Sequence, residues 1–209
     1  MPARVVLLHG LWMPALSMAL LARRLRAAGF VTESPPWWPR REGVAGAAAR
    51  LARDLGPPFP TLFVGHSLGG RLALALAAHA APRPTRVVAL GTPFAGSLAG
   101  QRLARVAPGR WLLARAAGDV TAAWSGTLPA GCDLGIVTGT RPLGLGRWVT
   151  GVDGPSDGTV RVAETRLAAA GERVELALTH LTLVAAPTAA AAAAGFLRSG
   201  HFPADLHNV

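Results

Sequence analysis

Short apolar segments alternate along this chain with longer segments that are rich in alanine, leucine and arginine. The apolar segments lack the polar alternation of a half-exposed strand, so each is expected to be buried on both sides. Strands of this kind, separated by helices, are typical of a parallel sheet with helices on both faces. The pattern predicts an α/β fold with about six mainly parallel strands. We expect strands at 4–8, 30–34, 61–64, 86–90, 134–138 and 173–178, and helices at 15–28, 44–55, 68–80, 99–117 and 185–197.

Length and composition narrow the class of protein. A chain of 209 residues fits a single domain, 1–209, and its 51% of hydrophobic residues exclude disorder over most of that length. The last stretch, 198–209, is expected to be a loosely held tail. The single cysteine, Cys132, excludes a disulfide framework and a cysteine-rich metal site. Because the apolar segment 176–197 contains His180 and Pro187, we expect no membrane span and a soluble, cytoplasmic protein.

The net charge of +10 comes from 21 basic residues, all of them arginine. These arginines occur at most two in a row, and the chain has no tyrosine. A nucleic-acid surface needs clustered basic residues and exposed stacking rings. We therefore expect a solvated basic surface and no nucleic-acid partner, and the sequence leaves the oligomeric state open.

The strongest motif is Gly65-His66-Ser67-Leu68-Gly69-Gly70, which fits the pattern G-x-S-x-G. A predicted strand precedes it and a predicted helix follows it. This is the context of a sharp turn that holds a nucleophilic serine in a strained backbone conformation. A second match, Gly154-Pro155-Ser156-Asp157-Gly158, has neither the strand nor the helix, so we interpret Ser156 as a loop serine. Ser67 is the predicted nucleophile.

A serine hydroxyl needs a base to take its proton and an acid to orient that base. Functional residues of open α/β sheets lie beyond the carboxyl ends of the strands. His180 follows the sixth predicted strand and is the predicted base, whereas His66 is expected to pack sideways. Asp153 and Asp157 both follow the fifth predicted strand, and spacing alone does not separate them.

Acyl transfer places negative charge on the former carbonyl oxygen, and two backbone N–H groups can stabilise it. The N–H of Leu68, directly after the serine, is the first predicted donor. The second is expected in the loop after the first strand, His9-Gly10-Leu11-Trp12, where Leu11 or Trp12 offers its N–H. The histidines and aspartates show no metal-ligand spacing, so no metal site is expected.

Large apolar side chains follow several predicted strands. These side chains are expected where an acyl chain would lie, and they form the predicted substrate-binding set. An equally good interpretation is that the rings merely cover the edge of the sheet. Trp37 and Trp38 stand beside Arg40 and Arg41, a combination that could touch an anionic membrane surface weakly. The predicted substrate-binding residues are Trp12, Met13, Trp37, Trp38 and Phe94.

Taken together, the chain resembles the α/β-hydrolase superfamily, specifically its small lipase- and esterase-like serine hydrolases. The resemblance rests on His9-Gly10, on the Ser67 motif, on Asp157-Gly158-Thr159-Val160 and on His180, in that chain order. It implies that Asp157 rather than Asp153 orients His180. It also implies that a small carboxylic ester with an apolar acyl group is hydrolysed through an acyl-enzyme, with no cofactor.

Two departures from the family follow from the same sequence. The usual first two strands are missing, and no long insert follows the fourth predicted strand, which implies a minimal cap or none. The triad also serves thioesterases, acyltransferases and C–C or amide hydrolases, so these remain alternatives. A non-catalytic protein of lipid surfaces on the same scaffold is a further alternative.

Overall fold

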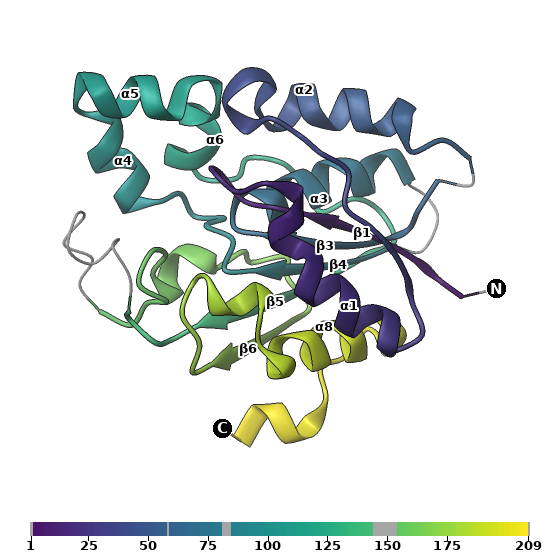
Figure 1. Cartoon of the computed structure of the whole chain (residues 1–209). Helices are drawn as coiled ribbons and strands as arrows, with labels where there is room; N and C mark the ends of the chain where they lie inside the picture. The colour runs from purple at the N-terminus through teal and green to yellow at the C-terminus, as the bar shows by residue number, and fades with distance from the viewer. Residues whose placement is uncertain (1, 58, 81–84, 144–153, 209) are drawn as a thin grey trace.

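A computed structural model describes residues 2–57, 59–80, 85–143 and 154–208 (Figure 1). Its centre is one sheet of six strands in the order β2-β1-β3-β4-β5-β6, and every described pairing of neighbours is parallel. This confirms the predicted α/β architecture. The strands are β1 Arg4–Leu8, β2 Val31–Glu33, β3 Leu62–His66, β4 Thr85–Leu90, β5 Cys132–Gly139 and β6 Glu172–Leu176.

Helices cover both faces of the sheet (Figure 1). Helices α1 (Ala19–Ala27) and α8 (Pro187–Ser199) pack on one face, and α2 (Pro39–Asp54) and α3 (Leu68–Ala80) pack on the other. Alternate residues of β1 enter the two cores, which explains why the strand is apolar throughout. None of the described helices combines the length and the apolar character that crossing a bilayer requires.

Helix α2 begins at Pro39, five residues before the predicted start at residue 44. Proline is well tolerated in the first turn of a helix, because the N–H it lacks would have no partner there. Gly43 interrupts the helix with a φ of 64°, and Asp119 accepts the N–H of Val44 at 2.8 Å. The first turn therefore continues into the regular part of α2 across a kink.

A small helical insertion separates β4 from β5 and lies beside α2 (Figure 1). It breaks at residues 105–106, close to the break that the sequence predicted near Pro108-Gly109, and again at Ala114; Pro108 itself lies in the first turn of α5. The insertion is too short to form a separate cap domain. Its elements are α4 Leu98–Ala104, α5 Ala107–Leu113, η2 Ala114–Ala116 and α6 Ala117–Thr121.

The C-terminal residues differ from the loosely held tail that the sequence predicted. Helix α8 extends through Ser199, and a short helical segment follows at Ala204–Asn208. Phe202 and Leu206 are buried, and the Phe202 ring contacts Phe196 at a centroid distance of 5.0 Å. Two buried apolar side chains thus hold this segment to the core. The remaining short helical turns are η1 Ala15–Met18, η3 Val162–Thr165 and η4 Thr182–Val184.

Candidate active site

The register of the sheet brings the loops after β1, β3 and β4 together at one edge. Leu8 is the partner of Gly65, and His66 is the partner of Leu90. The backbone N–H of Ser67 donates to the Leu90 carbonyl at 2.8 Å, so the turn after β3 is fixed to the end of β4. The predicted nucleophile therefore lies at the carboxyl edge of the sheet.

Ser67 occupies the tight turn between β3 and α3 that the sequence predicted. Its φ of 53° is in the left-handed region, which non-glycine residues rarely adopt. The turn depends on two glycines, because a Cβ at Gly65 would come within 2.3 Å of the Gly69 carbonyl oxygen. A Cβ at Gly69 would lie 2.2 Å from the Leu8 carbonyl oxygen. The strained serine is half-buried at the start of α3.

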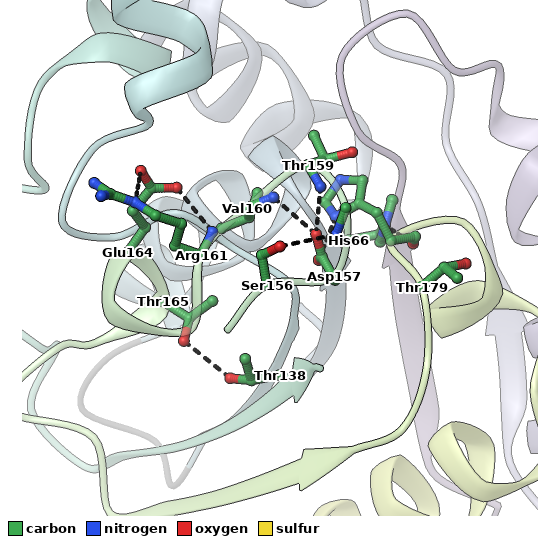
Figure 2. A network of polar contacts seen from close by, with 12 residues as sticks. His66, Thr138, Ser156, Asp157, Thr159, Val160, Arg161, Glu164, Thr165 and Thr179 are labelled. Carbon is green, nitrogen blue, oxygen red and sulfur yellow. Dashed lines mark hydrogen bonds and ion pairs between the residues drawn. The ribbon is translucent and has the colours of Figure 1, made fainter. Parts of the chain in front are cut away.

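Asp157 and His180 form a hydrogen-bonded pair, with 2.6 Å between Oδ2 and Nδ1. The aspartate is 1% exposed, and its Oδ1 accepts the N–H groups of Thr159 at 2.9 Å and Val160 at 2.7 Å (Figure 2). The His180 N–H also donates to the Asp157 carbonyl at 2.8 Å. With Nδ1–H donating to the carboxylate, the lone pair of the imidazole is on Nε2. Asp153, the alternative acid, lies outside the described residues.

Gly91 connects the nucleophile turn with this pair. It follows Leu90, the acceptor of the Ser67 N–H, and it has a φ of 58°. A Cβ at Gly91 would lie 3.0 Å from Asp157 Oδ2 and 3.2 Å from His180 Nδ1. The backbone at the end of β4 thus lies close to the acid and the base, and the Leu90 carbonyl of the same segment holds the serine turn. No hydrogen bond joins the Ser67 hydroxyl to His180 in the described residues.

His66 makes a long-range contact that sequence reasoning did not anticipate. Its ring lies 4.6 Å from the His180 ring, and its Nε2 donates to the His180 carbonyl at 2.9 Å. Burial lowers the pKa of His66 well below its usual value, and the neighbouring His180 lowers it further. His66 is therefore neutral near pH 7 and holds the backbone of His180 in place.

The two predicted oxyanion donors flank the serine. Leu68 is the first residue of α3, where N–H groups lack helical partners. A Cβ at Gly10 would lie 3.0 Å from the Ser67 Cβ, so the loop that carries Leu11 passes directly over the nucleophile. In the described structure no hydrogen bond occupies the N–H of Leu11 or of Leu68.

Four of the five predicted substrate-binding residues line a cavity of about 370 Å³. Trp37 is almost fully buried and donates its indole N–H to the His9 carbonyl at 3.1 Å, whereas Trp12 and Trp38 are exposed. Phe94 is the exception, because it is 1% exposed and packs into the core beneath α2 and α3. The cavity is lined by Trp12, Met13, Trp37, Trp38, Pro39, Arg40, Arg41 and Ala114.

Polar contacts of residues 161–165 brace the loop that carries Asp157 (Figure 2). Glu164 is buried, and it accepts bonds from Arg161 and from the N–H of Leu98 at the start of α4. The hydroxyls of Thr165 and Thr138 lie 2.9 Å apart and tie the loop to β5. The spacing of Arg161 and Glu164, three positions apart, was the one sequence signal for this contact, and the sequence analysis missed that signal.

The other chemistry-bearing side chains have structural surroundings. Ser156 is buried in a loop, and its Oγ accepts the Gly158 N–H at 3.4 Å, so the second G-x-S-x-G match is not a strand–turn–helix elbow. Burial raises the pKa of the Cys132 thiol to about 12, and Asp133 adds to the increase. In the part of the chain that the structure describes, no group of three histidine, cysteine, aspartate or glutamate side chains is placed to hold a metal ion.

No protein-family model and no curated protein matches the sequence. Solved structures do match. A Bacillus licheniformis lipase in its propeptide form aligns with a TM-score of 0.71 and 21% identity over 88% of this chain, which spans about half (47%) of the lipase. A pyrethroid hydrolase aligns with a TM-score of 0.65 and 14% identity over 96% of this chain and 99% of its own.

An extracellular α/β-hydrolase from a Paenibacillus species aligns with a TM-score of 0.56 and 14% identity, over 89% of this chain and 94% of its own. Identities this low carry information on the fold only. The fold of these solved structures agrees with the sheet order of this chain and with its strand–turn–helix at Ser67. The chain therefore has the α/β-hydrolase fold.

Proposed function

We propose that this protein is a serine hydrolase that cleaves carboxylic esters with an apolar acyl group through an acyl-enzyme. Ser67 is the nucleophile, His180 the general base and acid, and Asp157 the group that orients His180. The observation that carries the proposal is the 2.6 Å bond between Asp157 and His180 at the same sheet edge as the strained Ser67 turn. A nucleophile, a base and an acid that orients the base are the three groups that acyl transfer requires, and this observation supports those roles.

In the first half of the reaction, the Ser67 oxygen bonds to the ester carbonyl carbon while His180 Nε2 accepts the hydroxyl proton. The buried Asp157 carboxylate stabilises the imidazolium that forms. His180 then gives the proton to the alcohol oxygen as the bond between that oxygen and the carbonyl carbon breaks. The alcohol leaves, and the acyl group remains on Ser67.

In the second half, a water molecule gives a proton to His180 and attacks the acyl carbon. The bond to the Ser67 oxygen breaks, the serine recovers its proton from His180, and the acid leaves. In both halves the negative oxygen accepts from the N–H groups of Leu68 and Leu11. One such donor contributes about 3–4 kcal/mol to the stability of a transition state of this type.

The mechanism requires the Ser67 hydroxyl to reach His180 Nε2 when substrate is bound. Catalytic hydrogen bonds are often long in the free enzyme and tighten in the substrate complex. The bond from Asp157 fixes the His180 imidazole, and the bond from His66 fixes the His180 backbone. Rotation about the single bond between Cα and Cβ is the adjustment available to the Ser67 hydroxyl.

The test is the hydrolysis of p-nitrophenyl esters and matched thioesters of graded chain length. Ser67→Ala is expected to abolish turnover, and Ser156→Ala is the matched control that leaves it unchanged. Wild-type rates in Ser67→Ala would contradict the proposal. A preference for the thioester series would keep the triad and change the substrate class.

A further inference from the structure

Backbone strain is concentrated at two places in the described residues. Three non-glycine residues have positive φ there, namely Ser67 at 53°, Trp12 at 59° and Ala114 at 48°. Ser67 is the proposed nucleophile, and Trp12 and Ala114 both line the cavity described above. Strained conformations persist where the surrounding structure enforces them, and they cluster at catalytic and ligand-binding sites. The cavity wall therefore contains the same kind of strained backbone conformation as the proposed nucleophile.

The cavity begins close to the reacting centre. Trp12 is two residues after Gly10, whose Cβ position lies 3.0 Å from the Ser67 Cβ. Two Cα steps of about 3.8 Å place the Trp12 backbone within about 8 Å of Gly10. Trp37, on the floor of the cavity, is bonded to the carbonyl of His9 in the same loop. The cavity wall therefore includes residues of the loop that crosses Ser67.

One part of the cavity wall is aromatic and faces solvent. Trp12 is 57% exposed and Trp38 is 49% exposed, although both are large apolar side chains. Each ring is fixed in place, since Trp12 donates its indole N–H to the Leu112 carbonyl at 3.2 Å and the Arg50 guanidinium lies 5.1 Å from the Trp38 ring centroid. Rigid exposed rings that line a cavity provide a surface for an apolar ligand.

The other part of the wall carries positive charge without a matching carboxylate. In the described residues neither Arg40 nor Arg41 forms an ion pair. The nearby Glu42 is bonded to Arg50 at 2.9 and 3.0 Å, and Asp119 accepts the N–H of Val44. Both arginines lie in the turn of α2 that precedes the kink at Gly43.

Arg40 has an unused donor held in a defined position. Its guanidinium lies 4.8 Å from the Trp111 ring centroid and donates to the Trp111 carbonyl at 3.0 Å. Its Nε is buried and has no hydrogen-bond partner. The two contacts with Trp111 hold the guanidinium in a defined position, and in the described residues it has no carboxylate partner.

We propose that this cavity binds the anionic end of an amphipathic ester, with the apolar chain along Trp12 and Trp38 and a carboxylate or phosphate at Arg40 and Arg41. The substrate class is then an acyl ester with a negative charge remote from the reacting carbonyl. Its link to catalysis rests on the proposed function, whereas binding to the cavity does not. Aromatic rings and arginine together suit an amphipathic anion better than a neutral ester, because the guanidinium groups remain unpaired beside a neutral one.

The kinetic test compares two soluble esters of matched chain length, p-nitrophenyl hexanoate and the mono-p-nitrophenyl ester of adipic acid. We expect Arg40→Gln/Arg41→Gln to lower the ratio of kcat/KM for the anionic ester over the neutral ester by about tenfold. Arg41→Gln alone removes an exposed side chain and is expected to lower it by about threefold. Arg53→Gln, the same change farther along α2, leaves the ratio unchanged. An unchanged ratio in the double variant would overturn the proposal.

The binding test is independent of catalysis, because it uses Ser67→Ala protein and calorimetry with octyl phosphate or octyl glucoside. Octyl phosphate is expected to bind, and about tenfold more weakly when both arginines are replaced. Equal binding of the two amphiphiles would refute the anion site. Arginine-dependent binding to phosphatidylglycerol vesicles, without binding of soluble octyl phosphate, would also refute it and indicate a lipid surface. If Ser67→Ala retains esterase activity, the proposed function fails while the calorimetric result stands.

Discussion

Asp157→Asn tests the orientation of His180 with little change of shape. The carboxylate accepts three hydrogen bonds, two at Oδ1 from Thr159 and Val160 and one at Oδ2 from His180. An asparagine oxygen at the Oδ1 position keeps both backbone bonds. The amide nitrogen then faces His180 Nδ1 and donates to it, which moves the imidazole proton to Nε2. In that tautomer the base has no lone pair for the Ser67 proton.

The expected loss of rate follows from two terms. A hydrogen bond to a charged partner contributes about 1.5–3 kcal/mol, which corresponds to one to two decades in rate. The wrong tautomer adds a second penalty of comparable size, and together they predict a fall in kcat of about 10²–10⁴-fold. The melting temperature should change by no more than about 2–4 °C, because the bonds to the loop backbone remain.

The assay is steady-state hydrolysis of p-nitrophenyl butyrate, with thermal unfolding of the same samples. Asp133→Asn is the matched control, because Asp133 lies at the opposite end of β5 in a surface pair with Arg86 at 3.4 Å. Such pairs contribute about 0–1 kcal/mol, so kcat should not change. A folded Asp157→Asn protein with kcat within tenfold of the wild type would refute the role of Asp157.

Three further results are expected from the buried contacts. Because burial lowers the pKa of His66, the unfolded state binds a proton at this residue before the folded state does, and the free energy of unfolding should fall by about 1.4 kcal/mol for each pH unit below pH 6.5. Urea titrations should show a smaller slope in His66→Gln, and an equal slope would contradict this expectation. Gly91→Ala places a methyl group 3.0–3.2 Å from the acid and the base, so kcat should fall by about 10–100-fold, and unchanged kinetics would show that the pair tolerates the displacement. Phe202→Ala should cost about 3–5 kcal/mol in urea unfolding, whereas a loss below 1 kcal/mol would mean that the C-terminal segment packs weakly.

The sequence was sufficient for the parts of the fold that depend on local patterns. Strands β1, β3 and β4 are apolar because both of their faces are buried, and α3 begins directly after the nucleophile turn as predicted. The first turn of α2 was missed because Pro39, Arg40 and Arg41 show no apolar periodicity. The kink at Gly43 separates that turn from the regular part of α2, where the N–H of Val44 donates to distant Asp119.

The site was predictable where chain order and strand ends determine it. The predicted His180 and Asp157 are hydrogen-bonded to each other, although spacing alone had left Asp153 open. Phe94 shows the limit of the method, since its place after β4 fixes where its backbone lies and not where its ring points. The bond from His66 to His180 joins residues 114 positions apart, and no local pattern encodes it.

The central claim is that an ordinary serine hydroxyl becomes a nucleophile because His180 takes its proton. The most direct measurement is the rate at which a fluorophosphonate probe modifies the protein, followed by intact mass and by peptide mapping. We predict one probe per chain on Ser67, with labelling at least about 10³-fold slower in His180→Ala and unchanged in Ser156→Ala. Labelling of Ser67 at the wild-type rate in His180→Ala, or labelling of Ser156, would contradict the mechanism.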